Sequence, residues 1–312
     1  MKLHLSGILL LTAVWAHAST VDINVKDEVG NPVPNASIRV GFANFQGKEK
    51  TVEGISDARG HFHARGSPNH SIHIWASKNG HYPAVLRKLD PNVDHELVIV
   101  LPQILDPRAL YHVLRKYDGF PILPSFDTWY DFDMQVADWV APHGKGKAAD
   151  FRARLTRQFI DYYTSERNIQ EARRRFPNYD EDDLRRIWGD WELTFEIEFI
   201  GRGAGVVEWA SFHEYTEMPL PYNAPESGYQ ATWSFNYSNR ASGEKRDNVG
   251  HFGKTRVIYD EDGNEVSANF AKFISDPWVG TQGEMLFEYY FNPDPNDRNL
   301  EYNGTNLTET QK

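Results

Sequence analysis

Residues 191–199 are Trp-Glu-Leu-Thr-Phe-Glu-Ile-Glu-Phe, a stretch in which large apolar side chains alternate strictly with polar ones. Successive side chains of a β-strand point to opposite faces of its sheet, so this period of two predicts a strand with one buried and one solvated face. The same alternation occurs at residues 126–136 and 229–237. Strands of this kind are typical of antiparallel sheets packed face to face, and they predict an all-β second half of the chain.

About eight strands are expected between residues 124 and 302, which favours a β-sandwich of jelly-roll or lectin-like type. The further strands are predicted at 151–159, 205–212, 254–259, 265–274 and 284–291. Residues 165–176 and 180–188 instead have apolar side chains at helical spacing. We therefore expect a helical hairpin inserted between the strands.

A second set of short strands is expected at residues 19–101. Val21, Ile23 and Val25 alternate with polar residues, and turn formers such as Asp57-Ala58-Arg59-Gly60 separate the strands that follow. These six further strands are predicted at 37–42, 50–56, 61–64, 71–77, 84–89 and 96–101. Seven strands with regularly spaced turns predict a Greek-key β-sandwich. The chain is thus expected to form two antiparallel β-sandwich domains.

Residues 25–40, 54–62 and 79–82 together resemble the carboxypeptidase regulatory-like domain, which has a transthyretin-like β-sandwich fold. The resemblance implies a folding or binding module without catalytic residues, and nothing in the chain matches a zinc carboxypeptidase site. Through residues 138–151 and 292–301, the whole chain is similar to uncharacterised exported bacterial proteins that carry this domain. That similarity implies an architecture and leaves the function open.

The segment between the two domains, residues 102–123, contains several prolines and is predicted to be a linker. Within it, Asp106 and Pro107 are typical of a helix start, and the apolar residues up to Tyr117 share one helical face, which predicts a short helix. Residues 303–312 are expected to be a polar tail.

Residues 1–18 have the pattern of a cleaved signal peptide, with Lys2, an apolar run at 5–15 and the small residues Ala16 and Ala18 before the cleavage point. We expect export to the periplasm or outside the cell. No later stretch is long and apolar enough for a transmembrane segment in the mature chain. The net charge of −11 disfavours a nucleic-acid-binding role, and the absence of cysteine excludes disulfides and thiol catalysis.

The loop 138–150 is the main candidate for ligand binding. It combines Trp139, His143, Lys145 and Lys147 with two glycines that would let a ligand approach the backbone. The spacing of a phosphate-binding loop is absent. The alternative is a purely structural loop.

A second candidate is a calcium site at Asp294, Asn296 and Asp297, whose side chains offer oxygen ligands in a proline-stiffened loop. The alternative is an Asx-turn with an ion pair to Arg298. Residues 260–264 are expected to be a plain hairpin. A zinc site formed by the neighbouring histidines is less favoured; these are His61, His63, His70 and His73. No cofactor is expected, with calcium at the Asp294 loop as the alternative.

Carboxylates and aromatic rings on outward strand faces suggest two further kinds of site. A pair of carboxylates could catalyse glycoside hydrolysis, although such residues more often keep a sheet soluble; the candidates are Asp131, Asp133, Glu196 and Glu198. Trp129, Trp209 and Trp278 could stack on sugar rings, although core packing is the default for tryptophan.

The sequence therefore favours an exported, non-catalytic binding or structural protein of the bacterial envelope, with a glycan or an envelope protein as its partner. The alternative is an exported carbohydrate-active hydrolase whose site lies in the C-terminal domain.

Overall fold

The computed structural model describes residues 18–113, 122–161, 166–181, 184, 189–210, 213, 215–238, 249–280 and 283–308. The predicted signal peptide lies outside them except for Ala18. The chain divides into two compact units. Unit 1 is Met1–Ile104 with Tyr215–Glu217, and unit 2 is Leu105–Glu214 with Met218–Lys312.

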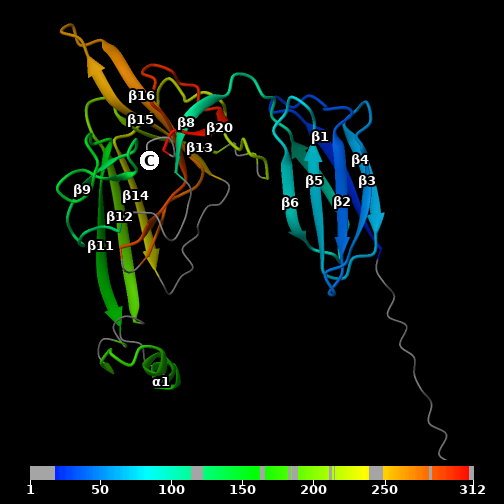
Figure 1. Ribbon diagram of the computed structural model, residues 1–312, viewed down its shortest axis with the longest axis horizontal. Coiled ribbons are helices and arrows are strands. Elements are labelled where there is room, and N and C mark those ends of the chain that lie inside the picture. Colours follow the sequence, from blue (N-terminus) through cyan, green and yellow to red (C-terminus); the bar gives the residue numbers. More distant parts are fainter. Residues whose placement is uncertain are drawn as a thin grey trace, which may run out of the picture. The chain divides into compact units, whose positions relative to one another are not determined.

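Unit 1 is a sandwich of seven strands, as the sequence predicts (Figure 1). One sheet has the order β4 (His61–Gly66), β1 (Ser19–Lys26), β7 (His95–Val100). The other has the order β3 (Glu49–Ile55), β2 (Ser37–Ala43), β5 (Ser71–Ser77), β6 (Ala84–Leu89). Alternate apolar residues of these strands, including Val21, Ile23, Ile38, Val40 and Ile74, form its core.

The strand pairs of unit 1 are antiparallel as expected, except that β1 pairs with β7 in parallel. Val21 lies opposite His95, and the register continues to Lys26 opposite Val100. The first and last strands of the unit are thus neighbours that run in the same direction. Strands paired in this way cannot be joined by a short hairpin turn.

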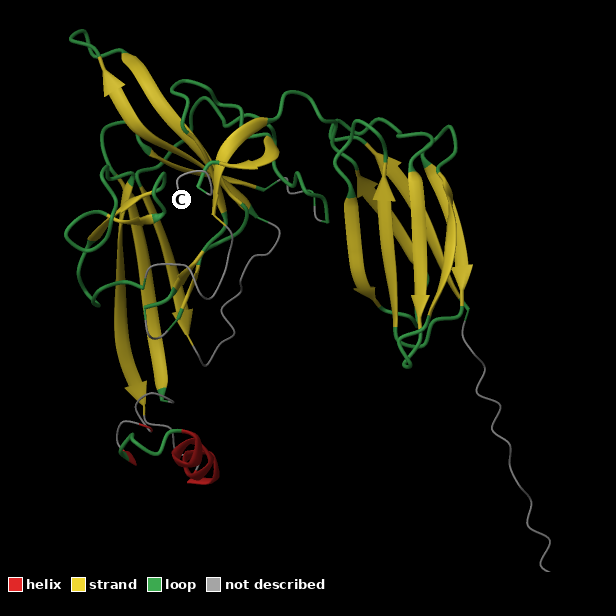
Figure 2. Ribbon diagram, in the orientation of Figure 1, coloured by secondary structure: helices red, strands yellow, loops and turns green. Residues whose placement is uncertain are grey.

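Unit 2 contains two larger sheets (Figure 2). The five-stranded sheet has the order β10 (Asp138–Trp139), β9 (Tyr130–Asp133), β11 (Phe151–Asp161), β12 (Asp190–Phe199), β14 (Thr232–Ser238). The six-stranded sheet has the order β13 (Gly205–Trp209), β15 (Gly250–Tyr259), β16 (Glu265–Phe273), β19 (Tyr289–Asn292), β8 (Arg108–Val113), β20 (Tyr302–Asn306). Two short strands, β17 (Trp278–Val279) and β18 (Met285–Leu286), pair separately. The protein is therefore an all-β sandwich.

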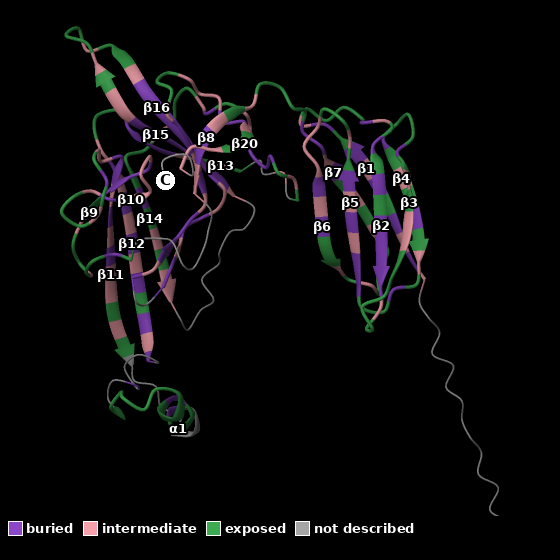
Figure 3. Cartoon of the chain, in the orientation of Figure 1, coloured by how far each residue is buried: buried purple, intermediate pink, exposed green. Residues whose placement is uncertain are grey.

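The main core of unit 2 contains inward-facing side chains from both sheets, and Figure 3 shows the resulting alternation of buried and mostly half-buried residues along β12. Phe132 and Phe151 stack with ring centroids 4.9 Å apart, and Phe287 packs against both. Offset and edge-to-face contacts of this kind add to the stabilisation from burial. A run of phenylalanines thus fills the space between the two sheets.

A smaller core lies on the other face of the six-stranded sheet. It contains Leu220 and Ala224 from the irregular segment 218–224, together with Phe252, Phe270 and Leu300. Tyr222 O accepts a hydrogen bond from Leu300 N, which joins this segment to the chain before β20. We call residues 218–224 the cover segment, because its Leu220 and Ala224 pack on Phe252 and Phe270 of this sheet.

The predicted linker helix is wrong, because residues 108–113 form strand β8 between β19 and β20. Leu110 and Tyr111 are buried there, and Tyr111 pairs with Phe291. Tertiary pairing with two strands overrides the local preference for a helix start at Asp106 and Pro107. The predicted polar tail is likewise a strand in part, since β20 pairs in parallel with β8.

Helix α1 (Glu166–Arg175) confirms the first helix of the predicted hairpin. Its Ile169 and Ala172 pack against Leu184. Most of the second predicted helix, residues 182–183 and 185–188, lies outside the described residues. None of the described helices is long and apolar enough to cross a membrane.

Candidate functional site

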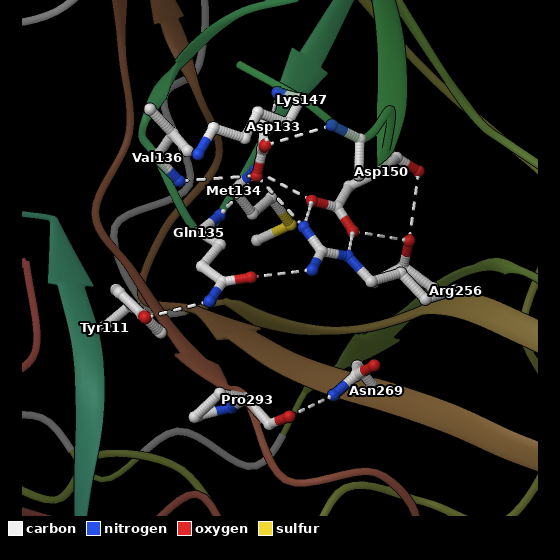
Figure 4. A network of polar contacts seen from close by, with 12 residues as sticks. Tyr111, Asp133, Met134, Gln135, Val136, Lys147, Asp150, Arg256, Asn269 and Pro293 are labelled. Carbon is white, nitrogen blue, oxygen red and sulfur yellow. Dashed lines mark hydrogen bonds and ion pairs between the residues drawn. The ribbon is translucent and has the colours of Figure 1, made fainter. Parts of the chain in front are cut away.

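Arg256 of β15 ties the loop between β9 and β11 to the six-stranded sheet (Figure 4). Its Nε and Nη2 donate to the two carboxylate oxygens of Asp150 at 2.8 and 2.9 Å. Nη2 also donates to Asp133 Oδ1 at 3.0 Å, and Nη1 donates to Gln135 Oε1 at 2.8 Å. One guanidinium thus binds three side chains at the two ends of the loop.

A backbone irregularity places Arg256 in this position. The register of β15 against β16 shifts after Thr255, and Arg256 has a φ of 53°. Bulges bend a strand and redirect a side chain, and they recur at functional sites. Thr255 is also part of the site, because its Oγ1 donates to Asp150 Oδ1 at 2.9 Å.

The loop itself is held by carboxylates that accept its backbone N–H groups. Asp133 Oδ2 accepts from Lys147 N at 2.8 Å and from Ala148 N at 3.1 Å. Asp138 Oδ2 accepts from Lys145 N at 2.9 Å, and Asp150 Oδ2 accepts from Met134 N at 2.8 Å. Because these bonds fix the backbone of the loop, its exposed side chains project from a rigid base.

The electrostatics of the network follow from burial and pairing. Burial raises the pKa of Asp150, and the hydrogen bonds and charge of Arg256 oppose that rise. Burial lowers the pKa of Arg256, but Asp150 and Asp133 together more than offset this effect, so its pKa lies above its usual value. Burial also raises the pKa of Tyr289 far above its usual value, and its hydroxyl donates to Met134 O at 2.7 Å. The guanidinium stays charged and the tyrosine stays neutral.

The four residues predicted for ligand binding fall into two groups. Trp139 is 2% exposed, and its Nε1 donates to Ile122 O, so its ring belongs to the core. His143, Lys145 and Lys147 are exposed, and His143 lies edge-on to Tyr130 with ring centroids 4.8 Å apart. The structure therefore brings one imidazole and two ammonium groups to the surface of one rigid loop. Their role in ligand binding stays a prediction.

Gly146 is needed in this loop because a side chain has no room there. An added Cβ would lie 2.8 Å from Asp133 Cβ and 2.9 Å from Asp138 O. We expect Gly146→Ala to destabilise unit 2 by about 1 to 3 kcal/mol, as overpacking does elsewhere, in urea unfolding followed by tryptophan fluorescence. Lys147→Ala is the control and should change stability by less than about 0.5 kcal/mol, since its side chain is exposed. Equal stability of the two variants would contradict this account of the loop.

The outer face of the five-stranded sheet carries ordered ion pairs beside Trp129. Arg152 Nη2 binds Glu198 at 2.7 Å, and Arg154 Nη2 binds Glu196 at 2.6 Å. Both guanidinium carbons lie over the indole of Trp129, 5.0 and 4.7 Å from its centroid. Trp129 is partly exposed, as expected for its outward position.

Cross-strand register continues this face over four strands. One row runs from Asp131 through Arg152 and Glu198 to Thr232, and the next runs from Arg154 through Glu196 to Ser234. A third row pairs Thr156, Thr194 and Asn236, in which Thr194 Oγ1 donates to Asn236 Oδ1. Asp133 is absent from this face. The alternating pattern predicts that it points outward, but it is 2% exposed and bound to Arg256, so that expectation is wrong.

The predicted calcium loop is a hydrogen-bonded corner. Asn296 Oδ1 accepts from Ala268 N, and its Nδ2 donates to Val266 O. Asp297 accepts from Asn299 N and lies 3.8 Å from Arg108 Nε. Asp294 is exposed, and its backbone N donates to Asn292 Oδ1. Among the described residues, no group of three or more His, Cys, Asp or Glu side chains is arranged to hold a metal ion.

The four histidines considered for a zinc site have different neighbours. His63 Nδ1 lies 2.7 Å from Asp22 Oδ1, and His73 Nε2 lies 2.9 Å from Ser71 Oγ. His61 and His70 are exposed, and the ring of His70 lies near that of Phe45.

Residues 260–264 and the two remaining tryptophans, Trp209 and Trp278, have roles within the fold. Residues 260–264 form the expected hairpin, and the backbone N–H of Asn264 lowers the pKa of Asp260. Trp209 packs edge-on against Phe252, and Trp278 lies in β17.

One polar row was missed by sequence reasoning because β8 was expected to be a helix. His112 of β8, Tyr290 of β19 and Lys272 of β16 are neighbours in register on the six-stranded sheet. The rings of His112 and Tyr290 are stacked at 4.1 Å, and His112 Nε2 lies 3.0 Å from Glu288 Oε1. Only an assignment of residues 108–113 as a strand could have placed His112 beside Tyr290.

No protein-family model matches the chain, and no curated protein matches it. Similar solved structures include catechol 1,2-dioxygenase from Pseudomonas arvilla C-1, with 14% identity and a TM-score of 0.24 over 28% of this chain and 52% of that one. Mercury-inhibited catechol 1,2-dioxygenase from Acinetobacter sp. ADP1 has 14% identity and a TM-score of 0.26 over 31% and 56%. The C-terminal domain of the shaft pilin spaA from Lactobacillus rhamnosus GG has 10% identity and a TM-score of 0.21 over 28% and 98%. The chain thus matches about half the length of the first of these structures, and the similarity is partial and weak.

Proposed function

We propose that this protein is an exported, non-catalytic glycan-binding protein of the bacterial envelope. The binding face would be the outer face of the five-stranded sheet, defined by Trp129, Arg152, Arg154, Glu196 and Glu198, with the loop 138–150 at its β10 edge. Unit 1 would be the accompanying module, in keeping with its resemblance to carboxypeptidase regulatory-like domains.

The arrangement around Trp129 carries the proposal. Sugar rings bind to proteins through their apolar faces and their hydroxyl groups together, so a suitable surface needs an aromatic plane beside fixed donors and acceptors. Trp129 supplies the plane, and Arg152 and Arg154 hold it from β11. The neighbouring rows end in the exposed hydroxyl and amide side chains of β14, which offer both donors and acceptors; these are Thr232, Ser234 and Asn236.

The loop 138–150 adds positive charge at the β10 edge of this sheet. Lys145 and Lys147 are exposed on a chain with a net charge of −11. They would favour glycans that carry carboxylate groups, through charge-assisted hydrogen bonds. By contrast, Glu196 and Glu198 are each bound by an arginine, so we do not assign them as the acid and base of a hydrolase.

The test is binding of the purified chain, without residues 1–18, to a glycan array, with release of reducing sugar monitored in parallel. Trp129→Ala should weaken binding to the retained glycan about tenfold or more, since an aromatic contact contributes about 0.5 to 1.5 kcal/mol beyond burial of its area. Trp75→Ala is the matched control, because Arg39 lies 4.8 Å over the Trp75 ring on a sheet of unit 1.

Binding that survives Trp129→Ala, or that is lost with Trp75→Ala, would refute the assignment of the face. Retention on no glycan at all would refute the ligand class. Release of reducing sugar by the unmodified chain would refute the non-catalytic role.

A further inference from the structure

Lys272 is a lysine in the interior of unit 2. It lies on β16 opposite Phe252 of β15 and Tyr290 of β19, and it is 1% exposed. Lysine is almost never fully buried unless its ammonium group is paired with a carboxylate. The surroundings of its amine therefore need an explanation.

Within the described part of the chain the Lys272 amine makes two close contacts, and neither is an ion pair. Nζ lies 3.2 Å from Met218 Sδ and 4.6 Å from the centroid of the Tyr290 ring. A thioether is a weak acceptor, and an aromatic face attracts a cation only modestly. Such a site favours the neutral amine over the ammonium form.

The two carboxylates whose charges act on Lys272 have other partners. Glu301 accepts from Leu105 N at 2.8 Å and from Asp106 N at 2.7 Å. Glu288 lies 3.0 Å from His112 Nε2 and 3.3 Å from Tyr290 Oη. Both carboxylates favour the charged form of Lys272 at a distance, but burial outweighs them and lowers its pKa to about 7.

Met218 connects this amine to a segment without regular structure. It is the first residue of the cover segment, residues 218–224, whose Leu220 and Ala224 pack on Phe252 and Phe270. The backbone of this segment is fixed at its far end, where Ala224 N donates to Arg298 O at 2.9 Å. Its near end rests on the amine of Lys272.

We propose that Lys272 is a pH-sensitive latch for the cover segment. With a neutral amine, Met218 closes over Nζ and the segment stays packed on the sheet. When the amine is protonated, the ammonium group requires water, and the segment opens locally from its Met218 end to admit it.

The direction and range of the effect follow from linkage. An opened state gives Lys272 its ordinary pKa of about 10.4, whereas the closed state has a pKa of about 7. The open state therefore binds more protons between these two values, so closure strengthens as pH rises from about 7 towards 10. Below about pH 7 the amine is charged in both states, and the opening equilibrium no longer depends on this group. The latch is tightest in alkaline solution.

Amide hydrogen exchange of the full chain at pH 7, 8 and 9, corrected for intrinsic exchange rates, tests the proposal. The readout is the amide of His213, which donates to Pro219 O at 2.9 Å, next to Met218 at the near end of the cover segment. Its protection should rise by up to about tenfold per pH unit, the slope for one linked proton. In Lys272→Met the protection should stay constant within about twofold. Lys254→Met is the control and should behave as the unmodified chain does, because Lys254 is paired with Glu265 at 2.5 Å.

The methyl resonance of Met218 provides a second measurement, since the chain has four methionines and selective labelling resolves them. It should change position with pH with a midpoint near 7 and lose this dependence in Lys272→Met. Protection that is constant from pH 7 to 9 in the unmodified chain would overturn the latch, even if the methyl group titrates. A pH-dependent protection that persists in Lys272→Met would overturn it as well.

Discussion

Arg256→Met is expected to destabilise unit 2 by about 3 to 5 kcal/mol, the usual effect of removing one partner from a buried ion pair. The side chains of Asp133 and Asp150 are 3% and 0% exposed, so neither carboxylate can recover hydration when the guanidinium is lost. Urea unfolding followed by tryptophan fluorescence and by circular dichroism measures the loss. A decrease below about 1 kcal/mol would show that the network does not hold the loop.

The control for this variant is Arg202→Met. Arg202 also lies over an aromatic ring, with its guanidinium carbon 4.4 Å from the centroid of Tyr259, but it is exposed and has no buried carboxylate as a partner among the described residues. Its replacement should change stability by less than about 1 kcal/mol. A loss equal to that of Arg256→Met would attribute the effect to arginine packing rather than to the buried charges.

The change in the stability of Arg256→Met with pH has a defined sign. Burial already raises the pKa of Asp150, and the loss of Arg256 removes the main opposing interaction. The folded state then binds a proton that the unfolded state has released, so the variant should gain stability relative to the unmodified chain as pH falls from 7 towards 4. Adding Asp150→Asn should restore part of the stability at pH 7, since it removes the unpaired charge. A double variant no more stable than Arg256→Met would contradict this interpretation.

Lys272→Met is expected to stabilise unit 2 at pH 7 by an amount on the order of 4 kcal/mol. A folded-state pKa of about 7 against about 10.4 in the unfolded chain means that folding at neutral pH opposes the preferred charge of this lysine. A tenfold difference in proton affinity between the folded and unfolded states corresponds to about 1.4 kcal/mol of stability. Methionine has a similar length and carries no charge, so it fills the same space beneath Met218 without this cost.

The same measurement repeated over pH identifies the cause. The unmodified chain should gain stability relative to the variant as pH rises from 7 to 10, and the difference should shrink towards zero. Lys254→Met should lose stability rather than gain it, because it breaks the ion pair with Glu265. A Lys272→Met variant that is less stable than the unmodified chain at pH 7 would show that the amine makes a net favourable contact in the folded state.

The strands of unit 1 were predictable because each has its own alternation and its own turn. Residues 71–77 and 84–89 were expected as strands, and they are β5 and β6. A half-buried strand can be assigned from its local sequence alone, because its apolar and polar side chains alternate with a period of two. The all-β class of both units follows from the same signal.

The site residues were less predictable because their roles depend on contacts distant in the sequence. Arg256 lies in a strand that was expected, but the bulge that turns it towards Asp150 involves a partner 106 residues away. Asp133 fits the outward half of an alternating pattern, and it is buried because the loop after it folds back over its carboxylate. Lys272 is buried against Met218 of the irregular cover segment and the ring of Tyr290. Periodicity says nothing about any of these contacts.

The position of β8 between β19 and β20 has a consequence for the order in which the protein forms. His112 N donates to Asn306 Oδ1 across a sequence separation of 194 residues. A chain that emerges from the ribosome with its N-terminus first presents β8 long before either neighbouring strand exists. The six-stranded sheet cannot close before residues 289–306 are available, which predicts slow folding of unit 2. A nascent chain that stalls shortly before residue 289 would therefore expose β8 as an unpaired edge, open to aggregation.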